Sequence, residues 1–212
     1  MSVETVYLAI DVEKVDDGQG AAIVAFGACL GDAHGKVLQT ASWYPAMPSY
    51  AKFGERCKAE FWDKHVGLYE SFAARARPAA EVYAEFRCWL DALELQYPKI
   101  VILSDNPAYD LGAIDNRLEK YCDRLPVRYT STGVYRWVSD WSERSDALGC
   151  YGKVREIAAK LMGDRLKRAH NPEIDAEYIY HCSVITERIR VAIKSDLDKL
   201  LTATYEKMDL SK

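Results

Sequence analysis

The chain has 212 residues, of which 49% are hydrophobic and 28% charged, and its formal net charge is −4 at pH 7. These values are typical of a globular protein with an apolar core, and they exclude a broad basic surface for binding duplex DNA. No apolar run approaches the ~20 residues that span a bilayer, and the N-terminus lacks a basic segment followed by an apolar one. We therefore expect a soluble, cytoplasmic protein without membrane contact. Six cysteines without a CxxC pair indicate buried, reduced thiols, neither a zinc site nor a disulfide framework.

Residues 6–13 form an almost unbroken apolar run that ends in two carboxylates, Asp11 and Glu13. On a strand, residues i and i+2 face the same side, so both side chains project from one edge of a buried strand. Burial and mutual repulsion oppose the ionisation of such a pair, and a divalent cation beside them removes this objection. This stretch alone is equally consistent with a strand end that has reached solvent.

Two more strands are predicted over residues 21–30 and 36–44, after a turn at residues 14–20. The loop between these strands has glycine at both ends, Gly31 and Gly35, which is typical of a hairpin. Three successive strands predict an antiparallel meander at the start of the sheet.

The middle of the chain alternates helices and strands. Apolar spacing predicts helices over residues 52–75 and 78–97, and residues 99–103 form a short apolar strand. Because this strand follows a helix, we expect a parallel crossover that returns it beside the first strand. A helix over residues 109–122 and a fifth strand over residues 126–130 follow. The pattern predicts an α/β fold with a mixed five-stranded sheet flanked by helices.

The last third of the chain is predicted to be mainly helical. A basic amphipathic helix is expected over residues 151–168 and a second amphipathic helix over residues 173–193. Residues 195–212 are expected to form a C-terminal packing helix and tail. No repeat or low-complexity linker interrupts the chain, so residues 1–212 are predicted to form a single domain.

Two further motifs carry polar residues next to apolar elements. Residues 104–110 follow the strand at 99–103, and Asp110 falls in the first turn of the next helix, where a carboxylate also suits the helix dipole. His170 lies in a loop, and Asp175 follows five residues later on the apolar face of a helix. A lone aspartate on such a face is costly unless another group compensates it.

Together, these motifs resemble the three motifs of the DEDDh 3′–5′ exonucleases, which share the ribonuclease H-like fold. The matching residues are Asp11-x-Glu13, Asn106-x-x-Tyr109-Asp110, and His170 with Asp175 five residues later. Their order and placement also match: a first strand, a helix after the fourth strand, and a loop before a late helix. The sequences of residues 104–110 and of Glu60-Phe61-Trp62 are most similar to those of a bacterial and phage exoribonuclease branch.

The resemblance implies a two-metal hydrolase. It assigns His170 as the general base, and it assigns four carboxylates as ligands of two Mg²⁺ or Mn²⁺ ions: Asp11, Glu13, Asp110 and Asp175. Two ions ~3.5–4 Å apart would position the water and stabilise charge on the phosphoryl and leaving oxygens. Hard oxygen ligands suit these cations, and the ordinary histidine pKa of ~6.5 suits a base near neutral pH.

The chain departs from the family pattern in two places. Many members have histidine where this chain has Asp105, and a Thr-Gly turn where it has residues 14–18. Both changes concern substrate contacts more than metal ligands, so they leave the substrate open.

Substrate contacts are predicted less sharply than metal ligands. The candidates for binding the nucleotide are Trp62, His65, Asn106 and Tyr109, although an aromatic residue such as Trp62 on an amphipathic helix is more often core. Aromatic residues at 135, 137 and 141 are suited either to stacking on bases or to packing under a long loop. The basic run at 165–168 either meets backbone phosphates or forms a solvated helix face.

The leading prediction is a metal-dependent 3′–5′ exonuclease acting on single-stranded RNA or DNA with a free 3′ end, with RNA or short oligonucleotides favoured. One alternative is a DNA-trimming or proofreading exodeoxyribonuclease. Another is a non-catalytic ribonuclease H-like module that binds nucleic acid or protein. All four carboxylates and the histidine are present, which argues against a site that has lost its catalytic function. A homodimer is left open.

Overall fold

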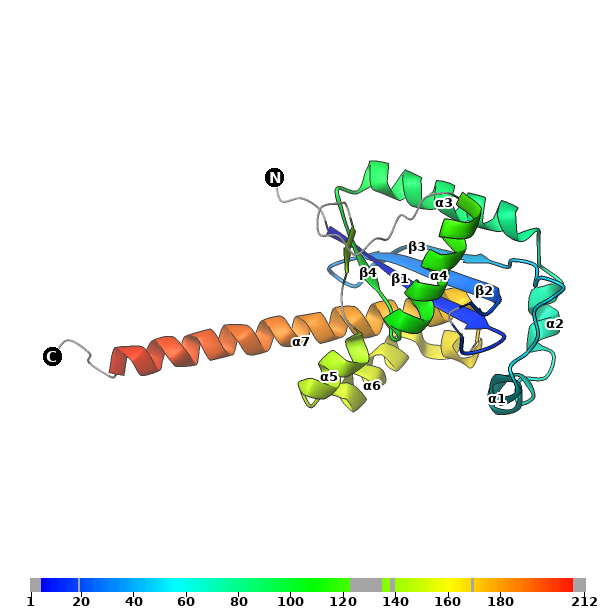
Figure 1. The fold of residues 1–212 in the computed structure, drawn as a ribbon. Helices are drawn as coiled ribbons and strands as arrows, with labels where there is room; N and C mark the ends of the chain where they lie inside the picture. Colours follow the sequence, from blue (N-terminus) through cyan, green and yellow to red (C-terminus); the bar gives the residue numbers. More distant parts are fainter. Residues whose placement is uncertain (1–4, 19, 123–134, 138–139, 169, 208–212) are drawn as a thin grey trace.

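The computed structural model describes residues 5–18, 20–122, 135–137, 140–168 and 170–207. A mixed sheet runs through the body of the molecule, and helices cover both of its faces (Figure 1). The five strands are β1 (Thr5–Lys14), β2 (Ile23–Asp32), β3 (Val37–Trp43), β4 (Lys99–Leu103) and β5 (Tyr135–Trp137).

The strand order is β3-β2-β1-β4-β5. The first three strands form an antiparallel meander, β4 runs parallel to β1, and β5 runs parallel to β4. The predicted α/β fold, the mixed five-stranded sheet and the parallel crossover are therefore confirmed. The strand predicted over residues 126–130 lies outside the described residues, and the fifth strand is found at β5.

One face of the sheet packs against α3 (Ala79–Gln96) and α4 (Pro107–Cys122). Val6, Leu8 and Ile10 of β1 are fully buried in this layer, because alternate residues of a strand point to the same side. The helices predicted over residues 78–97 and 109–122 are confirmed by α3 and α4.

The opposite face packs against α5 (Trp141–Ala147), α6 (Tyr151–Met162) and α7 (Pro172–Lys207). Ala9 of β1 belongs to this second core, together with Ala176 of α7. Asp11 and Glu13 follow Ala9 at the next two positions of the same parity, so β1 directs both carboxylates toward the face that holds the start of α7.

Two glycines of β2 allow α7 to lie directly on the sheet. A side chain at Gly27 would overlap the backbone of Pro172, and one at Gly31 would overlap the ring of Tyr180. The Tyr180 hydroxyl donates hydrogen bonds to the carbonyl oxygens of Asp32 and Lys36, at 2.8 and 3.1 Å, and thereby ties α7 to the β2–β3 hairpin.

The single helix predicted over residues 52–75 is wrong. The structure has α1 (Glu55–Cys57), a π-helical turn (Lys58–Trp62) and α2 (Leu68–Ala73) instead. Gly67 has a φ of +83° immediately before α2, a conformation that breaks a continuous helix. The segment still packs on the body through a third core, which includes Trp62 and Phe72.

The helix predicted over residues 151–168 ends early. α6 ends at Met162, Gly163 follows with a φ of +54°, and a 3-10 segment (Gly163–Arg168) leads toward His170. α5 was not predicted. None of the six cysteines, all of which are described, forms a disulfide, although only Cys29 and Cys182 are buried.

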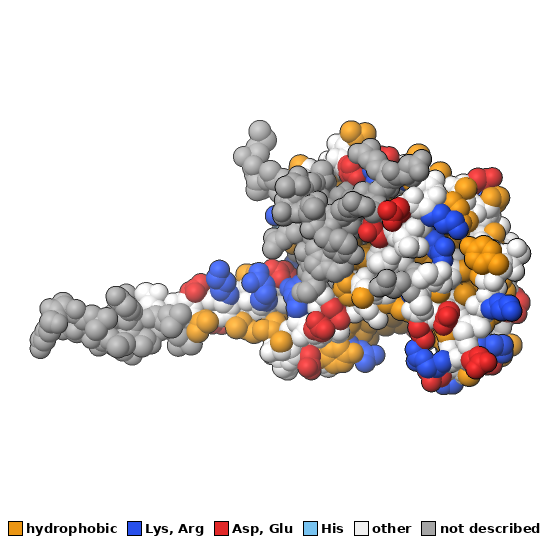
Figure 2. Space-filling model, in the orientation of Figure 1, with side chains coloured by type: hydrophobic (Ala, Val, Ile, Leu, Met, Phe, Trp, Pro, Cys, Tyr) orange, Lys and Arg blue, Asp and Glu red, His pale blue; other side chains and the backbone are white. Residues whose placement is uncertain are grey.

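The C-terminal part of the chain forms one helix rather than the two predicted. α7 runs without interruption from Pro172 to Lys207 and projects from the body (Figure 1). Residues 191–199 are all exposed, so the expected packing role of residues 195–212 is wrong where the structure describes side chains. Figure 2 shows hydrophobic and basic side chains along this projecting part. Among the described helices, none is long and apolar enough to cross a membrane.

Candidate active site

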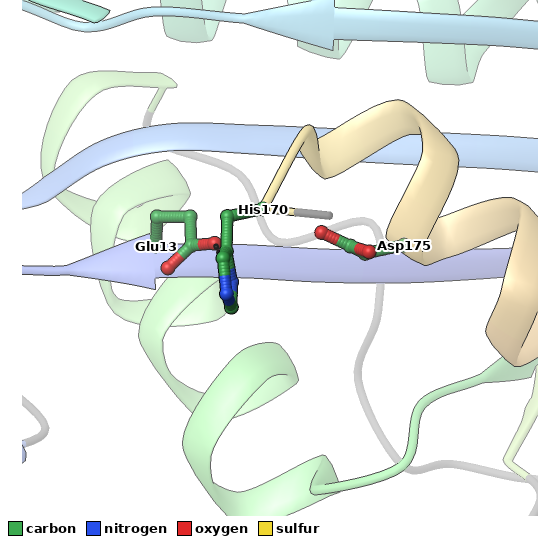
Figure 3. Close-up of side chains that lie close together, drawn as sticks. All are labelled: Glu13, His170 and Asp175. Atoms are coloured by element: carbon green, nitrogen blue, oxygen red, sulfur yellow. Dashed lines mark ion pairs between the residues drawn. The ribbon is translucent and has the colours of Figure 1, made fainter. Parts of the chain in front are cut away.

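Acidic side chains from three parts of the chain meet at one end of the sheet. They form two groups, and within each group the ligand atoms lie within 4.8 Å of one another. One group consists of Glu13, His170 and Asp175, and the other of Asp11, Asp105 and Asp110. Figure 3 shows Glu13 and Asp175 on either side of His170. The structure thus brings together all five residues predicted to act in catalysis.

Asp110 is held in place by the turn that begins α4. The Ser104 hydroxyl donates a 2.5 Å hydrogen bond to Oδ2 of Asp110, and the same hydroxyl accepts one from the backbone N–H of Asn106 at 3.0 Å. Asn106 caps the helix, because its carbonyl oxygen accepts hydrogen bonds from the backbone N–H groups of Tyr109 and Asp110, both at 2.9 Å. The carboxylate of Asp110 is only 2% exposed.

Asp175 is held by an equivalent turn at the start of α7. The carbonyl oxygen of Asn171 accepts hydrogen bonds from the N–H groups of Ile174 and Asp175, at 2.9 and 3.0 Å. Pro172 occupies the first helical position, where its fixed φ suits a helix start. The packing of Pro172 against Gly27 then sets the distance between Asp175 and the carboxylates of β1.

Burial and mutual repulsion raise the pKa of every carboxyl group in this cluster. Burial raises the pKa of Glu13 and of Asp110 to about 8 and that of Asp175 to about 7, and neighbouring carboxylates add to each rise. The pKa of Asp11 is raised well above its ordinary value by burial and then by Asp110, Glu13 and Asp175. Such a cluster favours either shared protons or a bound cation.

The donor set fits a hard divalent cation. Every acidic ligand offers oxygen, and the carboxylates converge from β1, α4 and α7 on a common space. Mg²⁺ and Mn²⁺ prefer oxygen ligands of this kind, and their charge would offset the repulsion that raises these pKa values.

His170 lies at the edge of the cluster in an unusual backbone conformation. Its φ is +63°, which is uncommon for a residue with a side chain. Its Nδ1 is 3.8 Å from Oε1 of Glu13, and its ring lies 4.1 Å from the ring of His65 between centroids. Phe61 meets the His170 ring edge-on at 4.9 Å. Burial, with a smaller effect from His65, lowers the pKa of His170, which favours the neutral form of its ring.

The predicted nucleotide-binding residues have different surroundings. His65 contacts His170 and also lines a cavity of about 240 Å³ with Trp62. Trp62 is only 7% exposed, and its Nε1 donates a 3.1 Å hydrogen bond to the carbonyl oxygen of Lys14, so it is mainly a core residue. Asn106 is exposed but caps α4, and Tyr109 is half-buried beneath the Lys14 ammonium group.

Two residues of this region were not predicted to join the site. The carboxylate of Asp105 lies with those of Asp11 and Asp110, although the sequence assigned this position to substrate contact. Lys14, 1% exposed, places Nζ 3.5 Å from the centroid of the Tyr109 ring and 3.4 Å from the carbonyl oxygen of Gly18. Lys14 could have been predicted to join the site, because it directly follows a predicted buried strand that ends in Asp-x-Glu.

The other residues considered for substrate binding, Trp141 and the basic run at 165–168, contact other parts of the protein. Trp141 is 4% exposed and belongs to the core under α5 and α6, which confirms packing as its role. Arg165 pairs with Glu177, and Lys167 pairs with Asp164. The side chains at 135 and 137 lie outside the described part of the chain.

No protein-family model matches the chain, and no curated protein matches it. Solved structures do match. A zinc-bound complex of E. coli exonuclease I with single-stranded DNA aligns over 98% of this chain at a TM-score of 0.55 and 15% identity. A product-bound exonuclease I aligns over 94% at 0.59 and 15%, and E. coli exonuclease I with a dA16 oligonucleotide over 87% at 0.62 and 13%.

The chain has the fold of the part of exonuclease I with which it aligns. It spans less than half of these neighbours, because the alignments cover 45%, 46% and 41% of their lengths. At these identities the likeness concerns the fold, which is the ribonuclease H-like fold expected from the three motifs. The neighbours named here are exonuclease I, so they do not support the narrower resemblance to an exoribonuclease branch.

Proposed function

We propose that the protein is a metal-dependent 3′–5′ exonuclease that removes nucleotides from the 3′ end of a single nucleic-acid strand. One observation carries the proposal: four carboxylates and a histidine, widely separated in sequence, converge at one end of a sheet with the exonuclease I fold. A stabilising role does not account for this arrangement, because burial and repulsion raise the pKa of each of these carboxyl groups.

The four carboxylates would hold the metal ions. Asp11 and Asp110 face each other from β1 and α4, and Glu13 faces Asp175 of α7, so the chain offers two adjacent acidic positions. Bound Mg²⁺ or Mn²⁺ would supply charge stabilisation at the phosphoryl group and its leaving oxygen. The side chains themselves fix where the scissile phosphodiester lies relative to the end of β1.

His170 would act as the general base. Its lowered pKa leaves an imidazole nitrogen free to accept a proton from water at neutral pH. The ring is one-third exposed, so it can reach solvent and substrate, while Phe61 and His65 limit its movement.

The substrate is proposed as single-stranded nucleic acid. Exonuclease I structures of the same fold contain single-stranded DNA, which supports the DNA alternative, whereas the RNA preference rests on the sequence of the motifs alone. RNA differs from DNA by the 2′-hydroxyl group, so strands of both kinds are the substrates that separate the two possibilities. A binding module without catalysis is a weaker proposal, because the acidic set and the histidine are complete.

A single assay tests the proposal. The protein is incubated with 5′-labelled single-stranded RNA and DNA in Mg²⁺, Mn²⁺ or EDTA, and the products are resolved by length. A ladder that shortens from the 3′ end and disappears in EDTA is expected for at least one sugar type. Asp110→Asn should abolish the ladder, whereas Asp196→Asn, on the exposed part of α7, should not. Metal-independent cleavage, or none with either strand, would contradict the proposal.

A further inference from the structure

The segment that carries His170 is anchored to α7 by an ion pair outside the carboxylate cluster. NH1 of Arg165, in the 3-10 segment before His170, lies 2.5 Å from Oε1 of Glu177. The side chain of Glu177 is only 6% exposed, whereas that of Arg165 is 45% exposed. A buried carboxylate of α7 thus holds a residue of the loop that leads to the proposed base.

A second nitrogen lies beside the same carboxylate oxygen. Nε2 of His181, one turn further along α7, is 3.4 Å from Oε1 of Glu177, and its side chain is 9% exposed. Arg165 also donates from Nε to the carbonyl oxygen of Met162, at 3.4 Å. Arg165 is therefore fixed both to the end of α6 and to the buried face of α7.

The backbone conformation of His170 needs support from its surroundings, and the Arg165–Glu177 ion pair is placed to supply it. A φ of +63° is unfavourable for histidine and persists only where the surrounding structure holds it. On its C-terminal side the loop is held by the Asn171 cap of α7. On its N-terminal side, Arg165 ties the 3-10 segment to α7 through its ion pair with Glu177.

We propose that Glu177 and Arg165 are positioning residues that hold the His170 ring beside Glu13. This rests on the proposed function, since it assigns them an effect on the base rather than on metal or strand binding. Without the ion pair, the 3-10 segment loses its tie to α7, and the loop is free to relax from the left-handed conformation of His170. A displacement of about 1 Å at a catalytic group is enough to lower turnover substantially.

The variants Arg165→Met and Glu177→Gln test the proposal. Both should fold, because Arg165 is half exposed and glutamine keeps an acceptor for His181. We expect kcat to fall about tenfold or more in each, while KM for the oligonucleotide and the Mn²⁺-induced rise in Tm change little. Arg165→Lys should recover part of the loss. Lys160→Met, which removes an exposed ion pair of α6, is the matched control.

A cycle with His170 separates positioning from general stability. Combined with His170→Ala, Arg165→Met should lower kcat no further, because the residue through which it acts is already absent. An equal loss with and without His170, or a parental kcat in Arg165→Met, would overturn the proposal.

A readout without catalysis keeps this test independent of the proposed function. The four histidines of the chain give separate imidazole proton signals in NMR, and the His170 signal is assigned with His170→Ala. In Arg165→Met the His170 signal should move, whereas in Lys160→Met it should not. If no strand is cleaved but this signal moves, the positioning stands and the exonuclease proposal fails. An unmoved signal overturns the positioning.

Discussion

Gly27 lies directly opposite Asp11 in the β1–β2 ladder, and the backbone of Pro172 fills the space where a side chain at Gly27 would be. This contact sets how closely the start of α7 approaches β1. Because Asp175 lies in the first turn of α7, the same contact sets the gap between its carboxylate and those of β1. A backbone contact between two residues that carry no ligand atoms therefore controls the spacing of the acidic cluster.

We expect Gly27→Ala to push the start of α7 away from the sheet. The added methyl group overlaps backbone atoms that cannot rotate away, so the free energy of unfolding should fall by about 1–3 kcal/mol. Metal affinity should also fall, because Asp175 is displaced. Thermal unfolding with and without Mn²⁺ measures both effects. Gly112→Ala, in α4 and with open space around the new methyl group, should preserve metal affinity and serves as the control. Unaltered metal affinity in Gly27→Ala would show that this contact does not set the cluster.

Metal addition should stabilise the protein through the carboxylates. At a Mn²⁺ concentration ~100 times its Kd, binding to the native state alone gives about 2.7 kcal/mol, or a rise in Tm of about 5–10 °C. Asp11→Asn should abolish most of this rise, because Asp11 lies centrally among Glu13, Asp110 and Asp175. Differential scanning fluorimetry with Mn²⁺, Mg²⁺ and EDTA checks this. A full metal-induced rise in Asp11→Asn would place the ions elsewhere.

The metal-free protein should lose stability as pH rises. Unfolded carboxyl groups release their protons near pH 4, whereas Asp175 keeps its proton to about pH 7 and Glu13 and Asp110 keep theirs to about pH 8. Because the native state binds more protons between these values, the free energy of unfolding falls from about pH 4 to pH 8. The lowered pKa values of His170 and His181 act in the opposite sense, but only below the ordinary histidine pKa.

The measurement is the Tm of EDTA-treated protein at pH 5, 6, 7 and 8. Saturating Mn²⁺ should remove the fall, because bound cations favour the ionised carboxylates. A Tm that rises across this range without metal would contradict the raised pKa values.

His170→Ala should separate catalysis from binding. Metal-induced stabilisation and oligonucleotide affinity should remain near parental values, while turnover falls by about 10²–10⁴-fold, the usual contribution of a positioned base. The remaining activity should rise with pH as hydroxide replaces the base, whereas the parental rate should level off once His170 is neutral. Single-turnover rates between pH 6 and 9 provide the test. Parental rates in His170→Ala would move the assignment of the base to His65, whose ring lies beside it.

The parts of the fold that follow from local chemistry were predictable. The strand at residues 99–103 has the bounds of β4, because its apolar run is closed by Pro98 and by the polar turn at Ser104. Asp11, Glu13, Asp110 and Asp175 could be grouped because their order and placement resemble the three exonuclease motifs. The direction of each side chain follows from strand parity or from a helix start, and the residues that determine it are neighbours in sequence.

Other features depend on contacts that no local pattern reports. Gly67 breaks a helical pattern whose apolar spacing continues on both sides. The Arg165–Glu177 pair joins two residues 12 positions apart across a turn, and the Tyr180 hydroxyl reaches a hairpin more than 140 positions away. α7 continues past Ser195 as a helix, although the side chains at 195–199 are exposed.

The projecting end of α7 affects how the size of the molecule should be measured. At about 1.5 Å per residue, residues 191–207 extend roughly 26 Å as a single helix. A body with such a rod diffuses more slowly than a sphere of equal mass, so it elutes early from a sizing column calibrated with compact standards. A monomer could then be mistaken for a dimer. Light scattering, which reports mass without assuming a shape, is the measurement that distinguishes the two.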